Sequence, residues 1–159
     1  MDELLLLTDG SVNTQLKFGY GAYLVVSDLE LSFDSLRTQI KIKRFQNTSS
    51  TKLELQTLLW ALSDIRLLRS KLTVYTDSQN IIGLRGRRKR FEQNDYRSKK
   101  NRRLNNYQLY QEFYRLTDQL DCEFVKVRGH KVSNQKDVID SIFALVDRAS
   151  RRALREVNE

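Results

Sequence analysis

The chain has 159 residues and carries 28 Lys and Arg against 20 Asp and Glu, a formal net charge of +8. This length suits one compact domain, expected over 1–159, and no apolar stretch is long enough to cross a bilayer. A single Cys and a single His exclude an internal disulfide and a Cys/His zinc cage. The start of the chain lacks the basic and apolar regions of a signal peptide, so we expect a cytoplasmic protein.

The first part of the chain, up to about residue 42, is predicted to form strands. Three early strands are predicted from short apolar or alternating runs, at residues 4–9, 18–27 and around 40–42. Gly19 and Gly21 indicate close backbone packing near the start of the second strand. Residues 28–37 have turn and strand character without clear boundaries.

Helices then alternate with strands. After 47–51, which offers several N-cap residues, apolar residues recur at helical spacing: Leu55, Leu58, Leu59, Leu62 and Ile65. A strand follows at 72–77, and Ser78 and Gln79 begin a second helix. Asn105 or Asn106 can cap a further helix. A last strand at 122–127 and a C-terminal helix complete a pattern that predicts an α/β domain with a mixed sheet.

Two phrases share one pattern, LLLLTDGS at 4–11 and KLTVYTDSQ at 71–79. Each is an apolar run that stops on a Thr-Asp pair, so Asp9 and Asp77 are expected where two strands leave the core. Two neighbouring carboxylates there repel each other unless a cation lies between them. Each Asp alone could instead cap the element that follows it, but the repetition favours a divalent-metal site.

Two helical acids could join the same cluster. Glu54 is placed in the first turn of its helix, where the helix dipole alone favours an acid. Asp147 lies beside Val146 on the core-facing edge of the last helix, where surface acids are less expected. Hard oxygen ligands without His or Cys favour Mg²⁺ or Mn²⁺ over zinc. Such ions let a water attack a phosphodiester in line and stabilise the leaving oxygen.

The excess positive charge lies in one segment, residues 85–103, which we call the handle. It holds ten basic and two acidic residues, so it carries 10 − 2 = +8, and the remainder, with 18 of each sign, is neutral. Phe91 and Tyr96 lie within it, and Tyr107 and Tyr110 follow, as expected where bases or sugars pack beside phosphates. The alternative is a disordered basic arm or a localisation tag.

Five pieces, in this order, resemble the type 1 ribonucleases H: TDGS, TKLELQTLLWAL, YTDSQ, VRGH and VDRASRRAL. The resemblance implies a ribonuclease H-like fold, a five-stranded mixed sheet flanked by helices, with a basic handle. It implies that four carboxylates bind two metal ions when substrate is present: Asp9, Glu54, Asp77 and Asp147. It also implies that His130, on a mobile loop, assists proton transfer or product release.

The resemblance further implies an RNA–DNA hybrid as the partner. Gln79 matches a position that reads the minor groove, and Ser49 begins a Ser-Ser-Thr stretch where many members have Thr-Asn-Asn. The handle would contact the DNA strand through Arg87, Arg88, Lys89 and Arg90. The gap between His130 and Asp147 is longer than in compact bacterial members, which leaves Asp140 as a competing fourth ligand. Asp147 is preferred because VDRASRRAL matches the family's helix pattern.

The implied activity is endonucleolytic cleavage of the RNA strand, leaving a 5′-phosphate and a 3′-hydroxyl. The expected cofactor is Mg²⁺, with Mn²⁺ as an alternative, and the expected state is a monomer without an obligatory protein partner. Two other hypotheses remain. One is another nuclease or resolvase of the same fold that acts on DNA. The other is a catalytically silent hybrid-binding module, against which the intact acidic set argues.

Overall fold

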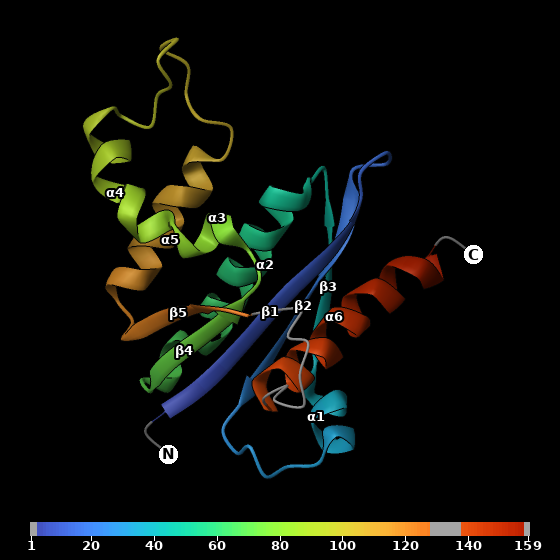
Figure 1. Ribbon diagram of the computed structural model, residues 1–159. Coiled ribbons are helices and arrows are strands. Elements are labelled where there is room, and N and C mark those ends of the chain that lie inside the picture. The colour runs from blue at the N-terminus through green and yellow to red at the C-terminus, as the bar shows by residue number, and fades with distance from the viewer. Residues whose placement is uncertain (1–2, 128–137, 158–159) are drawn as a thin grey trace.

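A five-stranded mixed sheet forms the centre of the molecule, with helices on both of its faces (Figure 1). The computed structural model describes residues 3–127 and 138–157. The strand order is β3-β2-β1-β4-β5, with β1 antiparallel to β2 and β2 to β3, and with β4 parallel to both β1 and β5. The strands are β1 (Glu3–Asn13), β2 (Phe18–Val26), β3 (Lys41–Gln46), β4 (Lys71–Thr76) and β5 (Cys122–Lys126). The predicted fold class is confirmed.

The helices follow the predicted order with two additions, a short helix at 33–39 and a 3-10 turn at 66–68, and the second predicted helix is divided in two. They are α1 (Phe33–Gln39), α2 (Ser50–Ile65), the 3-10 turn η1 (Arg66–Leu68), α3 (Gln79–Ile82), α4 (Leu84–Gln93), α5 (Tyr107–Asp118) and α6 (Val138–Val157). No helix within 3–127 and 138–157 is long and apolar enough to cross a membrane.

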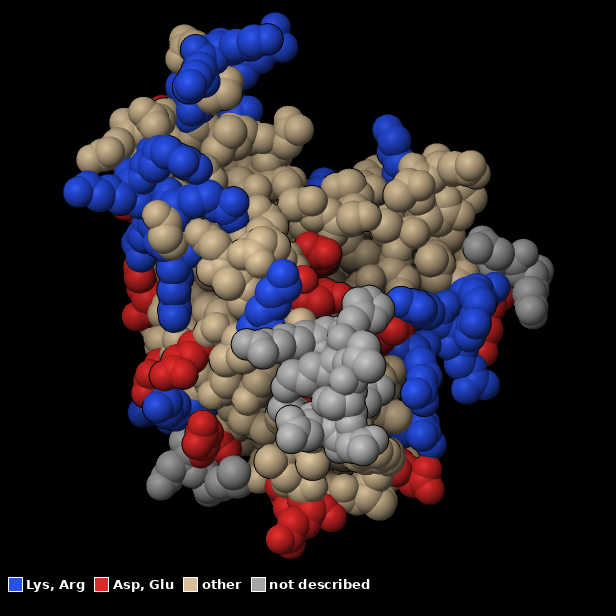
Figure 2. All heavy atoms as spheres, in the orientation of Figure 1, with Lys and Arg blue, Asp and Glu red and all other residues tan. Residues whose placement is uncertain are grey.

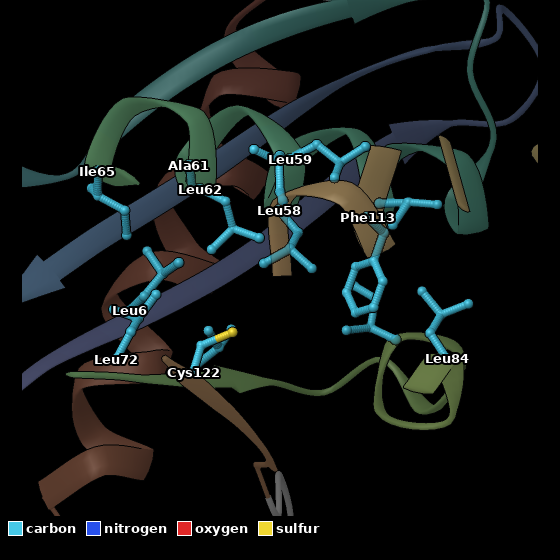
Figure 3. Packing of buried hydrophobic residues seen from close by; sticks show 14 of the residues in the cluster. Leu6, Leu58, Leu59, Ala61, Leu62, Ile65, Leu72, Leu84, Phe113 and Cys122 are labelled. Carbon is cyan, nitrogen blue, oxygen red and sulfur yellow. The ribbon is translucent and has the colours of Figure 1, made fainter. Parts of the chain in front are cut away.

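Alternating side chains of the strands supply two cores, one on each face of the sheet. On one face Leu6 of β1 packs with Leu58 and Leu62 of α2 and with Phe113 of α5 (Figure 3). On the other face Leu7, the next residue of β1, packs with buried residues of α6. Because the two cores clamp β1 from both sides, its end is a fixed platform for Asp9.

Helix α1 was not predicted. It begins after Ser32, whose hydroxyl accepts a hydrogen bond from the Ser35 backbone N–H at 3.1 Å, and it buries only Leu36. A helix of seven residues with one buried side chain lacks the apolar repeat by which longer helices are found. Strand β1 also runs past its predicted end at Asp9, because it pairs with β2 as far as Asn13.

Two glycines let α2 approach the sheet closely, as the sequence predicted. A Cβ atom on Gly21 would lie 2.1 Å from the Thr57 Oγ1 atom of α2, and one on Gly19 would lie 2.7 Å from the Leu53 Cδ2 atom of α2. Any larger residue at Gly21 would therefore push α2 away from β2. Thr57 lies one turn after Glu54, so the contact sets how near Glu54 comes to the strands.

The handle is folded rather than disordered. It consists of α4 and a turn that returns to α5, and Arg97 and Arg103 pair across it as an isolated bridge. Tyr96 is only 6% exposed, with its ring 5.8 Å from that of Phe91. Phe91 in turn stacks on Tyr110 of α5 at 5.1 Å. Tyr96 therefore anchors the handle and cannot stack on a base, contrary to the expectation from sequence.

Candidate active site

The register of the two central parallel strands brings the first pair of predicted acids together. Leu7 of β1 lies opposite Tyr75 of β4, so two residues further along each chain Asp9 and Asp77 meet at the same edge of the sheet. Asp77 directly follows β4 and is exposed, whereas Asp9 continues β1 and is only 8% exposed. The two repeated Thr-Asp phrases thus supply neighbouring carboxylates, as predicted.

Helix α2 brings the third acid to this edge. Glu54 is half-buried and hydrogen-bonds with Ser78, the N-cap of α3, and it feels the charge of Asp77. The helix begins at Ser50, so Glu54 is not in the first turn, where the sequence placed it. The helix dipole therefore does not account for this acid.

Helix α6 brings the fourth acid from the opposite face of the sheet. The carboxyl groups of Asp147 and Asp9 hydrogen-bond to each other. Behind Asp147, the Ser150 hydroxyl donates to the Asp147 carbonyl at 3.0 Å and lies 2.9 Å from the Ser11 hydroxyl of β1. The contact between these two serines fixes the position of α6 relative to β1, the strand that carries Asp9.

The gathered acids raise one another's proton affinity. Burial, the hydrogen bond with Asp147 and the negative charge of Asp77 raise the pKa of Asp9 to about 9. Burial also raises the pKa of Glu54, to which the charge of Asp77 adds. The pKa of Asp77 is raised by partial burial and then by the charge of Asp147. The site therefore holds more negative charge than its surroundings compensate.

Two basic residues partly offset this charge, and sequence reasoning missed both. The Arg151 guanidinium pairs with the Asp147 carboxylate at 3.0 Å, and Lys126 donates to the Gln79 side-chain oxygen at 3.0 Å. Both lower the pKa of Asp77. Arg151 could have been found from its i,i+4 spacing to Asp147. Lys126 could not, because only the pairing of β5 with β4 brings it to this edge.

The donor set suits a hard divalent cation. All four acids offer oxygen atoms, and the raised pKa of buried Asp9 reflects a deficit of positive charge that a bound ion would relieve. Within 3–127 and 138–157, no three His, Cys, Asp or Glu side chains already converge closely enough to hold one ion. Asp147, for example, is turned toward Arg151.

The two remaining predicted positions are Asp140, the competing fourth ligand, and His130. Asp140 is buried in the first turn of α6, two turns before Asp147, and the charges that act on Asp9 are those of Asp77 and Asp147. The geometry therefore brings Asp147 rather than Asp140 to the other acids. His130, the predicted assisting base, lies outside the described residues.

Two predicted substrate-binding residues flank the acids. Ser49 caps α2 by accepting a hydrogen bond from the Lys52 backbone N–H at 3.3 Å. It also lines a hollow of about 470 Å³ together with Thr14, Lys17, Asn47, Thr48, Lys52, Asn105 and Asn106. Amide and ammonium groups make this hollow suitable for a phosphate. Gln79 is exposed at the start of α3, beside Asp77.

The four basic residues predicted in the handle divide into two pairs. Arg87 donates to the backbone and side-chain oxygens of Asn80 at 2.5 and 2.9 Å, and Arg88 holds Asp118 with two hydrogen bonds at 2.6 and 2.9 Å. These contacts brace α4 against α3 and α5. Lys89 and Arg90 are exposed.

Basic side chains gather over the handle, and acidic side chains lie at the centre of the same view (Figure 2). Within the handle, Arg90 lines a hollow of about 620 Å³ with Phe91, Asn94, Arg97, Ser98, Lys99, Asn101 and Leu104. The positive charge available to a ligand therefore comes from Lys89, Arg90 and the hollow, because Arg87 and Arg88 are engaged in contacts within the protein.

Solved structures share this fold. A foamy viral protease–reverse transcriptase in complex with an RNA/DNA hybrid matches with a TM-score of 0.70 and 9% identity, over 94% of this chain and 19% of the viral chain. A structure of the viral protein in complex with double-stranded DNA matches with a TM-score of 0.63 and 9% identity, over 88% and 89% of the two chains. This chain thus spans about a fifth of the first viral chain.

Sequence comparison defines the family. The RNase H family model matches residues 1–147, and the chain belongs to the RNase H family. A ribonuclease H of Caldicellulosiruptor saccharolyticus is 25% identical over 150 residues, which are 89% of this chain and 94% of that protein. The family inferred from the five ordered motifs is therefore confirmed.

Proposed function

We propose that the protein is a metal-dependent endoribonuclease that hydrolyses the RNA strand of RNA–DNA hybrids and leaves 5′-phosphate and 3′-hydroxyl ends. The observation that carries the proposal is the meeting of Asp9, Asp77, Glu54 and Asp147 at one sheet edge in a member of the RNase H family. The similarity to a protein named ribonuclease H and to a viral protein solved with a hybrid supports the choice of substrate.

The four acids would hold two divalent ions, Mg²⁺ or Mn²⁺, once substrate is present. Ions bound there supply an activated water and stabilise the leaving oxygen. Asp9 provides a fixed, buried oxygen donor, because both cores clamp β1. Asp77 and Asp147 are nearer the surface and can turn toward an ion, and Asp147 is paired with Arg151 when no ion is bound. His130 is proposed to take or deliver a proton beside these acids.

Substrate binding is assigned to the surfaces around the acids. Gln79 and Ser49 are proposed to contact the duplex next to the cut strand, and contacts to 2′-hydroxyls would distinguish RNA from DNA. Lys89 and Arg90 of the handle would hold phosphates through long-range attraction. Arg87 and Arg88 are proposed to support this surface from within, since both already have partners in the chain.

The test is cleavage of matched RNA–DNA, RNA–RNA and DNA–DNA duplexes in Mg²⁺ and in EDTA. The proposal expects cutting of the hybrid alone, only with the metal, and with a 5′-phosphate on the product. Cutting of DNA would instead identify a DNA nuclease or resolvase of the same fold. Tight hybrid binding without cutting would identify a silent binding module.

A further inference from the structure

A second group of basic side chains lies on the other side of the acids from the handle. Arg148, Arg151, Arg152 and Arg155 are all exposed on α6, and we call them the α6 arginine face. Their spacing of three, four and seven residues places them on one side of the helix. Figure 2 shows the arrangement from the front: basic side chains over the handle, acidic side chains at the centre, and further basic side chains over α6.

The helix dipole does not explain this face. Cations favour the C-terminal end of a helix, but the effect fades beyond its last turn. Arg155 is in the last turn of α6, whereas Arg148 and Arg151 are not. Intramolecular pairing accounts for only two of the four, because Arg151 pairs with Asp147 and Arg152 with Glu156. Among the described residues, neither Arg148 nor Arg155 has an acidic partner within ion-pair distance.

The face is continuous with the candidate active site. The Arg151 guanidinium contacts Asp147 through Nε at 3.0 Å, and its side chain is still 68% exposed, so its remaining N–H groups point to solvent beside the acids. From Arg148 to Arg155 the helix rises by about 10 Å. One strand of a B-form duplex presents a phosphate about every 3.4 Å of its axis. The face therefore spans about three phosphates of one strand.

We propose that the α6 arginine face is a second phosphate-binding surface, which holds the hybrid on the side of the acids opposite the handle. The inference rests on the proposed function, because it names a further substrate contact of that same site. A duplex placed over the acids would be gripped on both sides. Its backbone would be held in register with the four carboxylates, which the handle alone cannot do from one side.

An acidic protein partner is the competing use of this region. Arg148, Arg152 and Arg155 also rim a hollow of about 500 Å³ between α6, α1 and β3, with a partly apolar floor that includes Ile42 and Leu145. The phosphate assignment is preferred because Arg151 of the face contacts Asp147 of the site itself, which a separate protein-docking groove would not require.

The test compares two variants of equal net charge. Arg148→Gln/Arg155→Gln removes the two arginines without ion pairs, so it breaks no ion pair among the described residues. Arg66→Gln/Arg69→Gln removes two exposed charges in η1 and directly after it, at the other end of the sheet from Asp77, and also breaks no ion pair among the described residues. Binding of a fluorescent hybrid is measured in EDTA across a range of salt concentrations, and cleavage is measured separately in Mg²⁺.

For a long hybrid, the α6 variant should bind about three- to tenfold more weakly than the control variant, as expected for two exposed charge pairs. The slope of log affinity against log salt should fall by about 1 to 2. Two hybrids truncated on either side of the cleavage site then locate the contact. One truncation should abolish the difference between the two variants, and the other should preserve it.

Equal affinity and equal salt slope for the two variants on the long hybrid would overturn the inference. So would a difference that survives both truncations, because it would show a general effect of charge rather than a located contact. A failed proposed function is distinguishable, since wild-type protein would then leave the hybrid uncut in Mg²⁺ whatever the variants bind in EDTA.

Discussion

Asp9 and Asp147 hydrogen-bond through their carboxyl groups although one lies in the first strand and the other in the last helix. Such a contact requires one of the two groups to carry a proton, and burial with the nearby charge of Asp77 raises the pKa of Asp9 to about 9. Without a cation, burial and the neighbouring carboxyl groups therefore favour the protonated form of Asp9. Binding of a cation would favour the ionised form instead.

Replacing Asp9 by Asn should abolish cleavage and raise the metal-free melting temperature near pH 8, by about 3 °C or more. The folded pKa of Asp9 exceeds its ordinary value of 3.8, so the stability that it contributes is complete below pH 3.8 and is lost as pH rises toward 9. Asn cannot ionise, so the variant should lose no stability from this position over the same pH range. Thermal melts of both proteins from pH 4 to pH 9 measure the difference.

Mg²⁺ supplies the control for that experiment. The ion should raise the melting temperature of the wild type by binding only the folded state, and the gain should shrink in Asp9→Asn. A variant that turns over hybrid at a near-normal rate would remove Asp9 from the site.

Asp147→Asn and Asp140→Asn form a matched pair on one helix. Asp147 contacts Asp9, so its replacement should lower the cleavage rate by orders of magnitude, whereas Asp140→Asn should cost little. Single-turnover rates at saturating hybrid measure this, and melts show whether each variant folds, because Asp140 is buried. A slow Asp140 variant beside an active Asp147 variant would assign the fourth ligand to Asp140.

Much of the site was predictable because its parts are local. A short apolar run ending in Thr-Asp marks Asp77 at the end of a strand, and the apolar stripe of α2 and α6 fixes the core side of each helix. The partners of these acids were not predictable. Ser78 beside Glu54, and Ser11 beside Ser150, meet only when the sheet and helices assemble.

The handle shows the limit of reading charge from sequence. Its ten basic residues look equivalent along the chain. In the fold, however, Arg88 is hydrogen-bonded to Asp118 of α5, thirty positions away, and Arg87 is hydrogen-bonded to Asn80. Tyr96 reads as a base-stacking residue, yet the turn at Asp95 and Tyr96, with φ of 52° and 56°, folds its ring inward. The sequence shows how many charged and aromatic side chains the handle has, but the tertiary contacts determine which of them can still contact a substrate.

His130→Ala should slow turnover by about 10²-fold, the usual range for a lost acid–base group. Hybrid affinity should barely change, because the role proposed for His130 is proton transfer rather than binding. The measurement is kcat and KM for a single hybrid at fixed salt. An unchanged kcat at saturating substrate would exclude His130 from the chemistry.

Gly21→Ala should destabilise the fold by about 1–3 kcal/mol, since the added Cβ would lie 2.1 Å from the Thr57 Oγ1 atom. It should also reduce cleavage, because α2 must move and carries Glu54 with it. Gly86→Ala in α4 is the control: apart from its chain neighbours and the backbone of its own helix, no heavy atom lies within 4 Å of its Cβ position. That change should stabilise the protein by about 0.5–1 kcal/mol through helix propensity. Urea unfolding measures both, and equal effects would refute the packing argument.

Splitting the four predicted handle residues into two double variants separates binding from support. Lys89→Gln/Arg90→Gln removes exposed charges, so hybrid affinity should fall and its salt dependence should flatten by about 1 to 2 in slope. Turnover at saturation should stay nearly intact, because the acids lie on other elements. Arg87→Gln/Arg88→Gln should instead lower stability by about 1–3 kcal/mol, since partly buried oxygens of Asn80 lose their donor. Binding isotherms at several salt concentrations, together with urea unfolding of each variant, distinguish the two roles. A reversed pattern, with the salt slope changed by Arg87 and Arg88 and stability by Lys89 and Arg90, would mean that the hybrid displaces the internal contacts of the handle.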